Sequence, residues 1–182
     1  MNTSIQSLRA GLVVLGLTCL GLTWTAVALA ADDKNLASNG NFEEVKDGVP
    51  TGWFSVCSEG GSVTHKALAE GVKEGKYCLH VTSKGEWAVA GSPKVPLDRT
   101  KTYTLTGLAR VKSGTVTIKI DYYKGDEYLG HSESDQSTKS EWTSLKVVSE
   151  LDSYKEATQI LVAGVIHGDG EAFFDGFELT AK

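Results

Sequence analysis

Two adjacent segments in the middle of the chain alternate between apolar and polar residues. In residues 101–111 and again in residues 115–123, nearly every second side chain is apolar or small, and most of the others are polar. Successive side chains of a β-strand point to opposite faces of a sheet, so this period of two predicts two strands, each with one buried and one solvent-facing surface. We expect residues 112–114, Lys-Ser-Gly, to form the turn between them.

The rest of the chain repeats this pattern in shorter pieces. Further strands are predicted at residues 35–44, 52–57, 63–68, 76–83, 87–90, 142–148, 160–166 and 172–179. A turn at residues 168–170 should precede the last of them. Beyond the first 30 residues no segment has a convincing helical period, and the 20 glycines suit a chain with many turns. About ten short strands predict an all-β fold, an antiparallel β-sandwich of the jelly-roll type.

Residues 1–30 have the composition of a targeting segment. Arg9 is their only charged residue, the stretch from Leu12 to Ala30 is largely apolar, and residues 28–30, Ala-Leu-Ala, form a small-x-small cleavage site. This combination indicates a secretory signal peptide, with an uncleaved membrane anchor as the alternative. We therefore expect an exported protein, periplasmic or extracellular, whose mature domain is residues 31–182 and does not insert into a membrane.

The charge balance restricts the partners of this domain. The whole sequence has 18 basic and 23 acidic residues, and loss of Arg9 with the signal peptide changes the net charge from −5 to −6. Nucleic acids and anionic lipid surfaces both select basic patches, so neither is expected as the main partner.

Two cysteines, Cys57 and Cys78, remain after removal of the signal peptide. A single pair in an exported chain predicts a disulfide, which in the chain-entropy model would stabilise the fold by about 3 kcal/mol. The alternative is two separately buried thiols.

Six short motifs occur in an order that is found in a known family. They are Asn35-Leu36, Asn39-Gly40-Asn41-Phe42-Glu43, Pro50-x-Gly52-Trp53, Lys101-Thr102-Tyr103-Thr104-Leu105, Glu141-Trp142-Thr143 and Phe174-Asp175-Gly176-Phe177-Glu178-Leu179. This series resembles the jelly-roll carbohydrate-binding modules of bacterial cellulases and xylanases, within the galactose-binding-domain-like superfamily. The resemblance covers nearly the whole mature chain and implies a sandwich that binds polysaccharide or oligosaccharide. It also implies that Phe42, Trp53, Tyr103 and Phe174 are core residues.

Two acids near the ends of the domain are candidates for a metal site. Glu43 belongs to the first predicted strand and Asp175 to the last, and we expect these strands to meet. Calcium binds carboxylate and carbonyl oxygens, and the resemblance implies a structural calcium ion held by Glu43 and Asp175. The alternative is that both acids cap turns or pair with lysines.

No catalytic motif is present in the sequence. It contains no His-Glu-x-x-His, Gly-x-Ser-x-Gly or phosphate-loop pattern, and its four histidines are scattered. The sequence therefore favours a binding module over an enzyme. Two alternatives stay open: a structural or adhesion module that binds protein or cell-surface material, and a small polysaccharide-active enzyme.

Carbohydrate sites combine aromatic platforms, on which sugar rings stack, with a few polar groups that bind hydroxyls. The candidates are polar or aromatic residues on the solvent-facing sides of predicted strands, where they can line a concave sheet: Trp87, Arg110, Lys119, Asp121, Tyr123, His80 and His167. An ordinary solvated sheet face is the alternative for each residue taken alone. The family's ligand residues vary, so none of these assignments comes from a family motif.

Overall fold

The computed structural model describes residues 34–182, and the predicted signal peptide lies outside them. The described part contains no α-helix, and hence no helix long and apolar enough to cross a membrane. Its strands are β1 (Val45–Lys46), β2 (Val49–Pro50), β3 (Phe54–Cys57), β4 (Ser62–Leu68), β5 (Cys78–Lys84), β6 (Trp87–Gly91), β7 (Val95–Pro96), β8 (Tyr103–Lys124), β9 (Glu127–Glu133), β10 (Thr143–Val148) and β11 (Gln159–Ala181). The predicted all-β antiparallel sandwich is confirmed.

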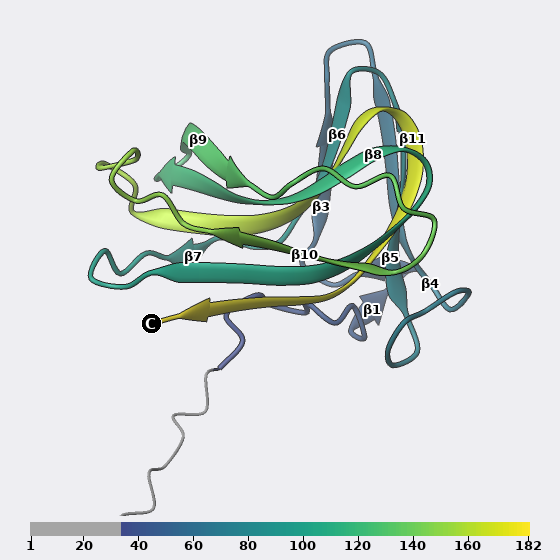
Figure 1. The fold of residues 1–182 in the computed structure, drawn as a ribbon, viewed down its shortest axis with the longest axis horizontal. Helices are drawn as coiled ribbons and strands as arrows, with labels where there is room; N and C mark the ends of the chain where they lie inside the picture. Colours follow the sequence, from purple (N-terminus) through teal and green to yellow (C-terminus); the bar gives the residue numbers. More distant parts are fainter. Residues whose placement is uncertain (1–33) are drawn as a thin grey trace, which may run out of the picture. The chain divides into compact units, whose positions relative to one another are not determined.

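The two longest strands, β8 and β11, run side by side through the whole domain (Figure 1). They pair antiparallel from Tyr123 opposite Gln159 to Tyr103 opposite Ala181. Both bend in the middle, where the register shifts after His167. The turns predicted at residues 112–114 and 168–170 are therefore wrong, because the chain bends there without reversing. Glycines with φ of +84° and +81° begin or end these bends, at positions 114 and 168.

The bends divide the strands into two layers. One layer, here called the groove layer, contains β3, β6, the first part of β11, the second part of β8, and β9. The other, the outer layer, contains β4, β5, the second part of β11, the first part of β8, and β10. Each long strand thus contributes to both layers, with the hydrophobic core between them.

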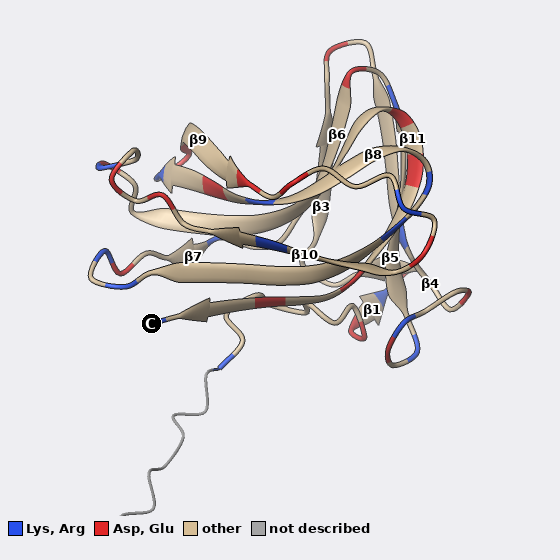
Figure 2. Ribbon diagram, viewed as in Figure 1, with Lys and Arg blue, Asp and Glu red and all other residues tan. Residues whose placement is uncertain are grey.

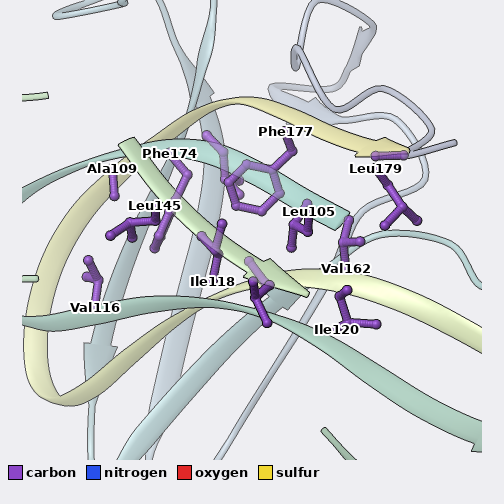
Figure 3. Close-up of a cluster of buried hydrophobic side chains, with 14 of the residues drawn as sticks. Leu105, Ala109, Val116, Ile118, Ile120, Leu145, Val162, Phe174, Phe177 and Leu179 are labelled. Atoms are coloured by element: carbon purple, nitrogen blue, oxygen red, sulfur yellow. The ribbon is translucent and has the colours of Figure 1, made fainter. Parts of the chain in front are cut away.

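The core confirms the alternation in the sequence. Figure 3 shows Ile118, Ile120 and Val162 of the groove layer among side chains of the outer layer, including Leu105 and Phe174. All five are fully buried. Removal of this apolar surface from water is the main favourable contribution to folding. The residues between them on the same strands face outward, which is where a binding surface can form.

The N-terminal segment differs from its prediction. Residues 35–44 do not form a strand, since Asn39 and Phe42 adopt left-handed backbone conformations with φ of 49° and 59°. The segment still lies against the end of β11: the Leu36 N–H donates to the Leu179 carbonyl at 2.8 Å. The two ends of the domain therefore meet, as predicted. Of the predicted core residues, Phe42 and Phe174 are fully buried, and Trp53 and Tyr103 are nearly so.

The predicted disulfide is wrong, since Cys57 and Cys78 are both free thiols. Cys57 ends β3, which pairs only with β6 in the groove layer. Cys78 begins β5 in the outer layer, where its Sγ lies 4.0 Å from the Glu70 carbonyl. The cysteines thus lie in different layers on strands that do not pair, and the number of cysteines in a sequence carries no information about this geometry.

The two thiols should differ in reactivity. Cys78 is fully buried, and burial raises its pKa to about 11, whereas Cys57 is only half-buried. Since the thiolate is the reactive species, a disulfide reagent at about pH 8 should modify Cys57 well before Cys78 in the native protein. Denaturation without a reductant should make both react at the same rate. Absence of free thiol in the denatured protein would contradict the structure.

Candidate functional site

A groove crosses the outward face of the groove layer, with a volume of about 380 Å³. Its lining combines aromatic, aliphatic and charged side chains from β3, β6, β8, β9 and β11: Phe54, Val56, Trp87, Val89, Lys119, Asp121, Tyr123, Tyr128, His131, Glu133, Val165 and His167. An apolar cluster of Val89, Leu161, Ala163 and Val165, with Tyr123 packed against it, lies on this face. Few parts of a protein surface combine so much apolar area with convergent polar groups, and this combination is typical of ligand sites.

Strand register positions these side chains. On β8, Lys119, Asp121 and Tyr123 alternate with buried core residues and therefore point into the groove. The partner strand β9 places Glu133 opposite Lys119, and His131 opposite Asp121. Cross-strand neighbours of this kind have Cβ atoms about 5 Å apart, so the polar groups form rows across the groove.

Aromatic rings line much of the groove. Trp87 and Tyr128 are 39% and 48% exposed, values high enough for a ring face to contact a ligand. Tyr128 also meets Tyr123 edge to face, with ring centroids 5.6 Å apart. The Nζ of Lys94 lies 4.2 Å from the Tyr123 ring centre, a cation–π contact that also helps to hold this ring in place.

The polar groups of the groove form two small networks. In the first, Lys119 and Asp121 form a largely buried ion pair, with 2.9 Å between Nζ and Oδ1. Burial raises the pKa of Asp121, and the positive charge of Lys119 opposes this shift. In the second, the Thr117 hydroxyl donates to Glu133 Oε1 at 2.6 Å and lies 3.0 Å from His167 Nε2. These contacts hold charged groups in fixed orientations beside the aromatic rings.

A hydrogen bond also fixes the most exposed ring. The Tyr128 hydroxyl lies 2.6 Å from His131 Nδ1. Burial of the hydroxyl is the largest cause of a raised pKa for Tyr128, so the phenol stays neutral in the physiological range. Tyr128 therefore presents a ring of fixed orientation to the groove.

Five of the seven ligand residues proposed from the sequence come together in this groove: Trp87, Lys119, Asp121, Tyr123 and His167. The other two, His80 and Arg110, do not, because they lie on the outward face of the outer layer. The cause is the bend in β8. Arg110 and Lys119 belong to one continuous strand, but the bend between them places their side chains on opposite outer surfaces of the sandwich.

The strand that contains β3 was predicted, but the groove residues of β3 and β9 were not among the candidates. The polar composition of residues 131–140 indicates a loop from the sequence alone, whereas β9 continues to Glu133. A register irregularity near Gly130, whose φ is +144°, allows Tyr128, His131 and Glu133 all to line the groove. Simple alternation from Tyr128 places His131 on the other face of the strand. The period of two in the sequence therefore could not identify His131 as a groove residue. The exposed Phe54 and Val56 of β3 were detectable as alternate apolar residues of a predicted strand.

The two candidate metal ligands contact the same loop. Glu43 Oε1 accepts the backbone N–H groups of Lys76 and Tyr77, at 2.8 and 3.0 Å. Asp175 Oδ2 accepts those of Lys73 and Glu74, at 3.2 and 3.1 Å. No group of three or more His, Cys, Asp or Glu suited to a metal occurs in residues 34–182. Because these lone pairs receive N–H donors, the contacts fit the turn-capping alternative better than a calcium cage, and calcium stays a prediction.

A two-layered sandwich with an aromatic groove on one face defines a ligand-binding module, and the comparisons with known proteins agree. The sequence profile of the family CBM_4_9, described as "Carbohydrate binding domain", matches residues 34–163. The chain belongs to this family. Comparison with curated proteins gives no match.

Solved structures of carbohydrate-binding modules share the fold. The family 11 module of cellulosomal cellulase Lic26A-Cel5E from Clostridium thermocellum has a TM-score of 0.59 and 14% identity, covering 82% of this chain and 94% of that one. The xylan-binding domain CBM22-1 of Paenibacillus barcinonensis Xyn10C has a TM-score of 0.57 and 16% identity, covering 74% and 88%. TmCBM61, solved with β-1,4-galactotriose, has a TM-score of 0.55 and 18% identity, covering 82% and 99%.

Proposed function

We propose that the mature chain is an exported, non-catalytic module that binds a polysaccharide or oligosaccharide along the groove. The single observation that supports this most is the convergence of exposed rings and oriented charged groups on one face of a carbohydrate-binding fold. Export rests on the composition of residues 1–30.

The groove offers the two kinds of contact that a sugar needs. The exposed faces of Trp87 and Tyr128 can stack against the C–H faces of pyranose rings. Asp121 and Glu133 accept hydrogen bonds from sugar hydroxyls, and Lys119 donates them. Since Lys119 and Asp121 are already paired, the groove is organised before a ligand arrives, which lowers the entropic cost of binding.

The structural neighbours support a glycan as the ligand. They do not specify which sugar, which depends on the residues of the groove. They include a xylan-binding domain, a family 11 module in complex with a β-1,3-1,4-mixed-linked tetrasaccharide, and a module in complex with β-1,4-galactotriose. One fold therefore serves several sugars, and the choice among them depends on individual groove residues. A glycan array with the mature protein is the direct way to identify the ligand class.

Trp87→Ala should weaken glycan binding at least about fivefold, because a central aromatic contact commonly contributes more than about 1 kcal/mol. Tyr123→Ala should act in the same direction, with a larger loss of stability because Tyr123 packs on the apolar cluster. Titration calorimetry with the best ligand from the array measures the affinity, and thermal melting measures the fold.

Val148→Ala is the matched control. Val148 is 44% exposed on β10 of the outer layer, outside the groove, and its loss should change neither affinity nor melting temperature. If Trp87→Ala and Tyr123→Ala both bind and melt like the unmodified protein, the groove is not the ligand site.

A further inference from the structure

A second hollow, of about 490 Å³, lies on the outward face of the outer layer. It is separate from the groove. Its lining includes His80 and Arg110, the two predicted ligand residues that do not line the groove. Lys66 of β4 and Lys112 and Glu171 near the bend also line it. Figure 2 shows oppositely charged segments close together where β8 and β11 bend.

Arg110 is the unusual member of this group. Its guanidinium lies against Phe173, 4.3 Å from the ring centre, and 5.5 Å from that of Trp142. Within residues 34–182 it makes neither a hydrogen bond nor an ion pair, and its Nε is buried without a partner. A guanidinium has five N–H donors, and burying even one of them, here Nε–H, without an acceptor is costly. The two rings fix its position and offset part of this cost.

His80 provides a second buried polar atom without a hydrogen-bond partner in the same hollow. The residue is 94% buried, given its exposed fraction of 6%, and its ring lies 4.8 Å from that of Phe173. His80 Nε2 contacts Glu171 Oε1 at 2.9 Å, while Nδ1 is buried without a partner. Buried polar atoms without partners are rare in native proteins and point to a missing water or ligand.

The charge around the hollow favours an anion. Glu171 is already paired, with His80 and with Lys112 at 3.1 Å. Lys66 is exposed and has no ion-pair partner in the described part of the chain. Three permanent cations, at positions 66, 110 and 112, therefore face two carboxylates, at positions 70 and 171. The hollow is locally positive on a chain whose net charge is −5.

We propose that this hollow is a second binding site, specific for the carboxylate of a uronic acid residue in an acidic glycan. The planar fork of Arg110 matches a carboxylate, and Lys66 adds a second cation at the open side. The choice of a glycan as the carrier of the carboxylate rests on the proposed function, whereas the anion site itself rests on the unpartnered Arg110.

A pair of tetrasaccharides that differ only in the carboxyl group tests the proposal. Tetraglucuronate with β-1,4 linkages and cellotetraose are each titrated into the ¹⁵N-labelled mature protein at low salt. Tetraglucuronate should shift the backbone signals of Lys66 and Phe173 and the Nε–H signal of Arg110, and cellotetraose should leave them unchanged. Added salt should weaken the effect.

Variants connect the signals to the proposed contacts. Arg110→Gln should raise the dissociation constant for tetraglucuronate at this hollow about tenfold, as expected for a charge-assisted hydrogen bond. Lys66→Gln, on an exposed side chain that is not needed for folding, should raise it about threefold. The control Lys146→Gln removes an exposed charge on β10 outside the hollow and should leave it unchanged.

Three results would overturn the second site: no shift at the hollow with tetraglucuronate, equal shifts with cellotetraose, or unchanged binding in both variants. If Arg110→Gln fails to fold, Lys66→Gln decides alone. Trp87→Ala separates the two proposals, because it should leave these shifts intact even though it weakens binding in the groove. Loss of glycan binding in the groove can therefore be distinguished from loss of binding at the hollow.

Discussion

Phe177→Ala should lower the free energy of unfolding by about 3–5 kcal/mol, the usual cost of removing a buried phenylalanine ring. Phe177 is 1% exposed and meets Phe42, Trp53 and Phe174 edge to face, with ring centroids 5.6–5.9 Å apart. A Cβ at Gly107 would lie 2.5 Å from the Phe177 ring, so the absence of a side chain at position 107 leaves room for the ring. Because this cluster joins the N-terminal segment to β11, the loss should also loosen residues 35–44.

Urea denaturation measures this loss. Val148→Ala is again the control, since an exposed substitution usually changes stability by less than about 0.5 kcal/mol. Phe177→Leu should give a smaller loss than Phe177→Ala, because leucine refills part of the cavity. A loss below about 1 kcal/mol for Phe177→Ala would mean that the ring is not a central part of the core.

The second large effect concerns Asp175 of β11, which is 1% exposed. Its carboxylate accepts the N–H groups of Lys73, Glu74 and Gly176. Asp175→Ala leaves these donors without an acceptor, so we expect a loss of about 3 kcal/mol by the cost of unsatisfied buried groups. Asp175→Asn retains one oxygen acceptor and should lose less.

The same variant tests calcium. A cation that binds only the folded state stabilises it by about 2.7 kcal/mol at a hundredfold excess over its dissociation constant. If Glu43 and Asp175 hold calcium, the mature protein should melt at a lower temperature in chelator than in millimolar calcium, and Asp175→Ala should abolish that difference. Identical melting temperatures in both conditions, in metal-free protein, would assign both acids to the loop at residues 73–77 alone.

The fold class was predictable because its signal is local. Alternation in β8 reports which side chains are buried, and residues such as Ile118 and Tyr122 are fully buried as expected. The bends were not predictable in the same way. A Lys-Ser-Gly sequence is compatible with a tight turn and with a bend, and only pairing with β11, distant in the sequence, selects between them.

The candidate site was predictable in part for the same reason. Lys119, Asp121 and Tyr123 follow directly from the period of β8. The contribution of β9 depends on an irregularity near Gly130 that resets the alternation, and the separation of Arg110 from Lys119 depends on the bend. Both are properties of the assembled sheet, so no inspection of single segments reveals them.

The alternation of groove and core side chains along β8 has an evolutionary consequence. Asp121 faces the groove between Ile120 and Tyr122, which face the core. Substitutions at every second position can therefore change the ligand preference while the packed interior stays the same. Inserting a single residue would exchange the two faces, exposing the interior and burying the charges. Lineages built on this scaffold should diversify by substitution within the strands and by insertion only in the connecting loops.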